Sequence, residues 1–169
     1  LIENLIENQM KDGGWNCENV LGATHSSFHT TISTLEGLWE YEKYKNYKVD
    51  PKIKQLQKQG FEFLLQHKLF KSDKTGEIVH RNLTMFSFPP RWRYDIMRCL
   101  DLAQEMSYEK DERFSDAIQI LINKKTKDGF WKLQNKHPGR VFFDMEKPGK
   151  ISRWNTLRAL RILNWWNSN

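Results

Sequence analysis

The stretch Asp128-Gly129-Phe130-Trp131 has an earlier counterpart in Asp12-Gly13-Gly14-Trp15, and the two tryptophans lie 116 residues apart. Each stretch follows a short apolar segment with helical character, which contains Leu121 in the later copy and Leu5 in the earlier one. An aspartate and a glycine after the end of a helix predict a tight turn, because glycine adopts left-handed backbone angles at little cost. The tryptophan can then cover the start of the next helix. The pair therefore predicts a repeated structural corner.

Turn and capping residues divide the rest of the chain into expected helices. After a helix tail in residues 1–10, helices are expected at 25–44, 50–67, 91–106, 111–124 and 152–166. Their expected caps are Thr24 or Ser26, Asp50, Asp111 and Ser152, with Pro89-Pro90 introducing the helix at 91–106. Residues 68–88 read as a long polar linker. In the connection at 130–150, Val141-Phe142-Phe143 is expected to form a short strand or one arm of a β-hairpin.

These helices show further repetition. Gly37, Cys99 and Ala159 occupy the same place in three similar four-residue segments, and a small side chain lets neighbouring helices approach closely. The caps Asp50 and Asp111 lie 61 residues apart. The predicted fold is therefore all-α, a stack of about three helical hairpins forming one domain over residues 1–169. Because the chain starts with leucine, a truncated N-terminus is left open.

Composition limits the function classes. No apolar run reaches membrane-spanning length, so no transmembrane segment is expected, and no signal peptide is evident. Cys17 and Cys99 give no disulfide framework, which favours a reducing, cytoplasmic location. The net charge is +6, but the lysines are scattered among acidic and amide residues. Nucleic-acid binding is not expected, because it requires clustered basic residues together with stacking aromatics.

The stretch Gln9-x-x-Asp12-Gly13-Gly14-Trp15 resembles the glutamine–tryptophan motif of the α/α-toroid superfamily, which comprises squalene and terpenoid cyclases and protein prenyltransferase β subunits. The stretch from Lys125 to Trp131 matches it with lysine in place of glutamine, and a middle copy around Asp73 and Gly76 lacks the tryptophan. The resemblance implies inner helices at 25–44, 91–106 and 152–166 around an apolar cavity, with outer helices at 50–67 and 111–124. A full ring needs roughly twice as many hairpins. The stack is therefore expected to be open or partial, or completed by missing chain or by a homo-oligomer.

The family's chemistry does not carry over to this sequence. The cyclases of this superfamily that protonate a double bond share an Asp-x-Asp-Asp stretch, which is absent from this sequence. The Asp-x-Cys pair of the prenyltransferase zinc site is also absent, since neither Cys17 nor Cys99 has an aspartate two residues before it. No catalytic residue is assigned, and whether the protein is an enzyme stays open.

Cys17, His25 and His29 are candidate metal ligands. His25 and His29 are four residues apart at an expected helix start, which would place them on one face, and Cys17 lies in the preceding loop. Zinc is the one cofactor that this arrangement suggests. The alternative is that both histidines bond backbone groups or water while Cys17 packs as a small apolar residue.

A second candidate site lies at the expected inner-helix starts, where side chains would converge near one mouth of a toroid cavity. The residues of this predicted rim are Trp92, Tyr94, Asp95, Arg153, Trp154 and Asn155, together with His25 and His29. An aromatic and polar rim can orient a ligand that has one charged end. The alternative is that Asp95 pairs with Arg153 while the tryptophans pack between hairpins.

Three functions follow from these patterns. The first is binding of a hydrophobic or isoprenoid-like ligand between the inner helices. The second is a metal-dependent enzyme that uses Cys17, His25 and His29. The third is a structural or interaction module whose stack ends bind another chain.

Overall fold

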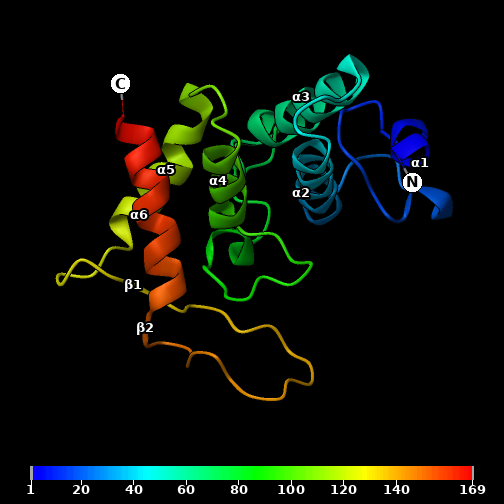
Figure 1. Ribbon diagram of the computed structural model, residues 1–169. Helices are drawn as coiled ribbons and strands as arrows, with labels where there is room; N and C mark the ends of the chain where they lie inside the picture. The colour runs from blue at the N-terminus through cyan, green and yellow to red at the C-terminus, as the bar shows by residue number, and fades with distance from the viewer. Residues whose placement is uncertain (1, 169) are drawn as a thin grey trace. The chain divides into compact units, whose positions relative to one another are not determined.

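The computed structural model describes residues 2–168, which form two compact units that divide after His67 (Figure 1). The described residues contain six α-helices, three short 3₁₀ helices and one two-stranded sheet, which confirms a mostly helical protein. Across these residues, none of the helices combines the length and apolarity needed to cross a membrane. The toroid arrangement and the single domain over 1–169 stay predictions.

Unit 1 contains α1 (Ile2–Glu7), η1 (Asn19–Leu21), α2 (Phe28–Tyr44) and α3 (Pro51–Gln66). Helix α2 packs against α3, and a Lys54–Glu42 ion pair also joins these two helices. Asp50 caps α3 as predicted, because its carboxylate accepts the Lys52 backbone N–H at 2.8 Å and Pro51 occupies the first helical position.

The start of α2 differs from the prediction. The helix begins at Phe28 with Ser27 at the N-cap position, so neither Thr24 nor Ser26 caps it. Ser26 is instead held by Asp12, whose carboxylate accepts the Ser26 backbone N–H at 2.8 Å and its hydroxyl at 2.5 Å. The side chain that would have satisfied the helix end is thus used to close the loop before it.

The tryptophan corner of unit 1 connects its three α-helices. Gly13 has a φ of +94°, which gives the turn after α1 its left-handed residue. The Trp15 indole donates back to the Leu5 carbonyl at 2.7 Å, and the Trp15 backbone N–H donates forward to the Thr31 hydroxyl at 3.0 Å. Its ring lies against Gly60 of α3, where an added Cβ would come within 2.8 Å of the indole. The predicted structural role is confirmed, and the tryptophan bonds to the helix before it as well as the one after it.

Unit 2 contains η2 (Arg81–Thr84), α4 (Ile96–Glu105), η3 (Glu112–Phe114), α5 (Ser115–Asn123), the strands β1 (Trp131–Lys132) and β2 (Ile151–Ser152), and α6 (Arg153–Asn167). Helix α4 packs against α6, and Asp101 bridges Arg158 and Arg161 at 3.0 and 2.6 Å.

Two of the predicted caps in unit 2 are confirmed and one helix start is corrected. Asp111 accepts the Arg113 backbone N–H at 2.8 Å, and Ser152 accepts that of Asn155 at 2.9 Å. The helix predicted from residue 91 begins at Ile96, because Asp95 supplies its cap and the segment after Pro90 is irregular.

The corner of unit 2 repeats the bonds of unit 1. Gly129 has a φ of +88°. The Trp131 indole donates to the Leu121 carbonyl at 2.7 Å, and its backbone N–H donates to the Thr156 hydroxyl at 3.0 Å. Trp131 also pairs with Ser152 in the antiparallel β1–β2 ladder. The two corners are therefore structural copies, each joining the end of one helix to the start of another.

The helical register predicted from small residues is wrong. Cys99 and Ala159 are fully buried, whereas Gly37 is exposed and an added Cβ there would meet nothing within 4 Å. The corner bonds instead make Thr31 equivalent to Thr156. Gly37 therefore does not share the buried environment of Cys99 and Ala159.

The two long connections also differ from expectation. Residues 68–88 are not simply a polar linker, because Leu69, Phe70, Leu83 and Phe86 are buried and Lys71 forms a β-bridge with Ile78. Within the connection at 130–150, residues 141–143 form no strand, and strand pairing occurs instead at its two ends, in β1 and β2. The bonded ends leave the middle of this loop exposed.

Candidate functional site

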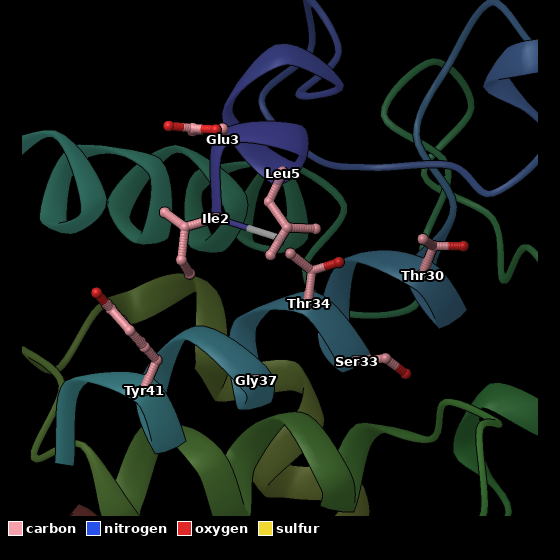
Figure 2. Close-up of a pocket in the computed structure, with 8 residues that line it drawn as sticks. All are labelled: Ile2, Glu3, Leu5, Thr30, Ser33, Thr34, Gly37 and Tyr41. Carbon is pink, nitrogen blue, oxygen red and sulfur yellow. The ribbon is translucent and has the colours of Figure 1, made fainter. Parts of the chain in front are cut away.

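An open groove of about 660 Å³ lies along α2 in unit 1, beneath α1 (Figure 2). Its lining is mostly apolar and consists of Ile2, Glu3, Leu5, Thr30, Ser33, Thr34, Gly37 and Tyr41. Ile2 and Leu5 extend from α1 towards α2, and Tyr41 extends from α2 at one end (Figure 2). Small-molecule sites usually occupy roughly 300–1,000 Å³ and combine apolar walls with a few polar groups, so both size and lining suit a small ligand.

Gly37 is one of the residues that line the groove. This residue lies in the interior of α2, where glycine lowers helix stability by roughly 0.5–1 kcal/mol relative to alanine. Nothing lies within 4 Å of the position that its Cβ would occupy. A larger residue here would therefore project into the groove without striking another part of the protein.

The polar groups of the groove are mostly hydroxyls. The Thr30 hydroxyl accepts the Cys17 backbone N–H at 3.2 Å, and the Ser33 hydroxyl donates to the His29 carbonyl at 3.0 Å. Glu3, which is exposed, supplies the one carboxylate among the lining residues. The groove can therefore hold an apolar body with a hydroxyl or similar uncharged polar end, and it offers little to a multiply charged ligand.

The predicted rim residues Tyr94 and Asp95 lie side by side in the chain but serve the local structure. Tyr94 is buried, and its hydroxyl donates to the Leu69 carbonyl at 2.8 Å. Burial, followed by the proximity of Cys99, raises the pKa of Tyr94 well above its ordinary value. The Asp95 carboxylate accepts the Arg98 backbone N–H at 2.9 Å and the Ser87 hydroxyl at 2.7 Å. Both side chains are thus occupied by bonds that hold the start of α4.

The two tryptophans of the predicted rim are more exposed. Trp92 lies outside α4 with the Arg93 guanidinium 4.5 Å from its ring centroid. Trp154 stacks on Phe88 at 5.0 Å, which agrees with the alternative of a packing tryptophan.

Arg153 and Asn155 stand at the start of α6. The Arg153 backbone N–H donates to the Glu146 carboxylate at 2.7 Å. Asn155 is buried and donates to the Lys132 carbonyl at 3.3 Å. Asn155 therefore joins the first turn of α6 to β1 through its side-chain amide.

His25 and His29 do not share a helical face as predicted, because α2 begins only at Phe28, whereas Cys17 lies in the preceding loop as expected. Cys17 is a free, exposed thiol, His25 is exposed in the loop before α2, and His29 is the second residue of α2. Over residues 2–168, no cluster of three or more His, Cys, Asp and Glu side chains is arranged to hold a metal ion. The zinc site stays a prediction for which the geometry adds no support.

A second groove, of about 450 Å³, lies in unit 2. Lys124 lines it, and its ammonium donates to the Thr84 carbonyl and to Gln134 Oε1, both at 2.7 Å. The same ammonium lies 4.8 Å from the Phe86 ring centroid. Burial lowers the pKa of Lys124, against the opposing attraction of Asp95. This lysine is already bound to protein groups, so the groove is a poorer candidate for a ligand than the one in unit 1.

The sequence patterns included Leu5 and Gly37 of the unit 1 groove, but assigned Leu5 to a helix end and Gly37 to helix packing. The signal was present as a row of small residues on α2, at Thr30, Ser33, Thr34 and Gly37. That row alone could not reveal a groove, because the opposite wall comes from α1. Comparisons with protein-family models, with curated proteins and with solved structures find no match for this chain.

Proposed function

We propose that the protein binds a hydrophobic small molecule of isoprenoid-like character in the unit 1 groove. The observation that carries the proposal is the mostly apolar groove of about 660 Å³ along α2, with Gly37 in its lining. Apolar walls favour a hydrocarbon chain through burial of its surface, at about 25 cal/mol per Å². The hydroxyls and Tyr41 suit an alcohol end group, which makes farnesol a reasonable probe.

The test is to fill the groove from within. Gly37→Leu places an apolar side chain into the groove while the helix gains a better helix former, so the variant should remain folded. We expect wild-type protein to bind farnesol in a fluorescence or calorimetric titration, and Gly37→Leu to lose at least roughly 10-fold in affinity.

Glu40→Leu is the matched control, because it adds the same side chain at an exposed position of α2 outside the groove lining. It should bind like wild type. Equal farnesol affinity in wild type and Gly37→Leu, or no binding by the wild type of farnesol or other isoprenoid alcohols, would contradict the proposal.

A second candidate function is interaction with another helical chain through α6. Leu157 and Leu160 are about half exposed on this helix, at 48% and 49%, and Trp154 is 39% exposed beside them. In stacked helical repeats an end with exposed leucines is covered by a further repeat, since terminal repeats otherwise carry a polar outer face. Light scattering can test self-association through this face. Wild type should be an oligomer, and the double variant Leu157→Glu with Leu160→Glu should be a monomer. A wild-type monomer would exclude self-association through this face.

A further inference from the structure

Residues 136–150, here called the Phe142 loop, present a group of large apolar side chains to solvent. Phe142 is fully exposed and Phe143 is 73% exposed, and Val141 and Met145 are nearly half exposed beside them. In Figure 1 the loop extends from the β1–β2 strand pair as a long yellow-to-orange segment without helix or strand. Consecutive exposed phenylalanines are unfavourable in water and mark surfaces that meet an apolar partner.

The base of this loop is bonded on both sides. The Leu133 backbone N–H donates to the Lys150 carbonyl at 2.9 Å, and the Gly149 N–H donates back to the Leu133 carbonyl at 2.7 Å. The Arg91 guanidinium donates to the Pro138 carbonyl at 2.8 Å. A loop anchored in this way presents its apolar tip with less ordering cost than a free segment would.

Basic residues flank the apolar tip along the sequence. Residues 136–153 contain five basic side chains, Lys136, Arg140, Lys147, Lys150 and Arg153, against the two acids Asp144 and Glu146, which gives 5 − 2 = +3.

Both acids are engaged within the protein. Asp144 forms an ion pair with Lys136, and Glu146 accepts the backbone N–H groups of Arg153 and Trp154 at the start of α6. A carboxylate in that position is stabilised by the positive end of the helix. The side chains left to face an outside partner are therefore predominantly basic.

We infer that the Phe142 loop docks on an anionic lipid surface, with Phe142 and Phe143 entering the boundary between headgroups and acyl chains. Peripheral membrane binding combines buried apolar area with attraction of basic residues to anionic lipids, and the loop supplies both. Nucleic acid fits less well. Phe142 and Phe143 have rings that can stack on bases, but Val141 and Met145 beside them are aliphatic and suit acyl chains instead. The inference goes beyond the proposed function, since it concerns a different part of the chain.

The experiment is co-sedimentation of the whole chain with vesicles of phosphatidylcholine alone or of phosphatidylcholine mixed with phosphatidylserine. Wild type should sediment with the mixed vesicles and much less with the neutral ones. Phe142→Ser with Phe143→Ser should lower the partition coefficient by at least roughly 10-fold, because two buried phenyl groups are lost. Lys147→Glu with Lys150→Glu should lower it by about 10-fold or more on the mixed vesicles.

Matched controls separate the loop from general stickiness and from net charge. Val20→Ser with Leu21→Ser removes two other apolar side chains that are more than 80% exposed, and Lys52→Glu with Lys58→Glu makes the same charge change on α3. Both controls should sediment like wild type, and circular dichroism should show all variants folded.

Three results would overturn the inference. They are a wild type that ignores mixed vesicles, loop variants that sediment as well as wild type, and equal sedimentation with neutral and anionic vesicles. Loop-dependent binding to single-stranded RNA without vesicle binding would assign the surface to nucleic acid instead.

Discussion

The corners at Trp15 and Trp131 make the same backbone and indole bonds, yet they differ in what surrounds them. In both, the indole donates to a helix-end carbonyl at 2.7 Å and the backbone N–H donates to a threonine hydroxyl at 3.0 Å. The first corner adds a ring contact with Gly60 of α3, whereas the second adds pairing of Trp131 with Ser152 in a two-stranded ladder. The same set of bonds thus occurs in two surroundings. In unit 1 the tryptophan packs against a helix, and in unit 2 it pairs in a two-stranded ladder.

The largest expected effect comes from removing either tryptophan. Trp15→Ala and Trp131→Ala each empty a buried position and break both the indole bond and the packing around it, so each should lower the free energy of unfolding by about 3–5 kcal/mol. Chemical denaturation followed by circular dichroism measures the change. Trp15→Phe and Trp131→Phe retain most of the ring and should cost less, with the lost hydrogen bond contributing about 1 kcal/mol. A cost below about 1 kcal/mol for either alanine variant would show that its corner is not a structural joint.

The next effect concerns the helix behind the first corner. Gly60→Ala would place a Cβ 2.8 Å from the Trp15 ring and 2.9 Å from a Leu35 methyl, so it should destabilise unit 1 by about 1–3 kcal/mol. Gly37→Ala makes the same substitution in α2 at an exposed position with open space, and it should stabilise by about 0.5–1 kcal/mol. Denaturation midpoints of the two variants should therefore shift in opposite directions. A Gly60→Ala variant at least as stable as wild type would mean that the Trp15 ring does not rest on Gly60.

Local chemistry explains how much of this could be predicted from sequence. The caps at Asp50, Asp111 and Ser152 and the two Asp-Gly turns depend on residues within a few positions of one another, so short patterns predict them. The corners were recognised as repeats for the same reason.

The alignment of the helices that follow the two corners could not be predicted from short patterns, because the loops between corner and helix differ in length. Ser27, whose N–H bonds the Trp15 carbonyl, comes 12 residues after that tryptophan, whereas Ser152, which pairs with Trp131, comes 21 residues after its own. Gly37 and Ala159 were superposed on similar four-residue segments, 159 − 37 = 122 residues apart, whereas the bonds that pair Thr31 with Thr156 give 156 − 31 = 125. The groove was missed for a related reason, because α1 supplies its second wall.

A smaller effect separates the two aspartates of the corners. The Asp12 carboxylate holds both the backbone N–H and the hydroxyl of Ser26, so Asp12→Ala should cost about 1–2 kcal/mol. Asp128 is exposed at the equivalent position, and Asp128→Ala should change stability by less than about 0.5 kcal/mol. Asp12→Asn with paired unfolding curves provides the control, since the amide oxygen can keep one of the two bonds. If Asp12→Ala and Asp128→Ala lower the free energy of unfolding equally, the bonds from Asp12 to Ser26 do not distinguish the two corners.

The smallest effect concerns the residue three places before each aspartate. The Gln9 amide donates to the Gly13 carbonyl at 2.7 Å and to the Leu56 carbonyl of α3 at 3.1 Å, so it joins the corner to the helix behind it. Lys125 cannot copy this role in unit 2, and its ammonium lies 5.7 Å from the Trp131 ring centroid. Gln9→Lys should therefore cost about 0.5–1.5 kcal/mol, because it places a longer, charged side chain at a partly buried position that an uncharged amide now fills.

Lys125→Gln should be nearly neutral, since a weak cation–π contact at an exposed residue, worth about 0.5–1 kcal/mol, is exchanged for a possible hydrogen bond within the turn. If Lys125→Gln instead stabilises by as much as Gln9→Lys destabilises, the glutamine acts within the turn alone. In that case the contact with Leu56 contributes nothing, and the two corners would be energetically alike despite their different surroundings.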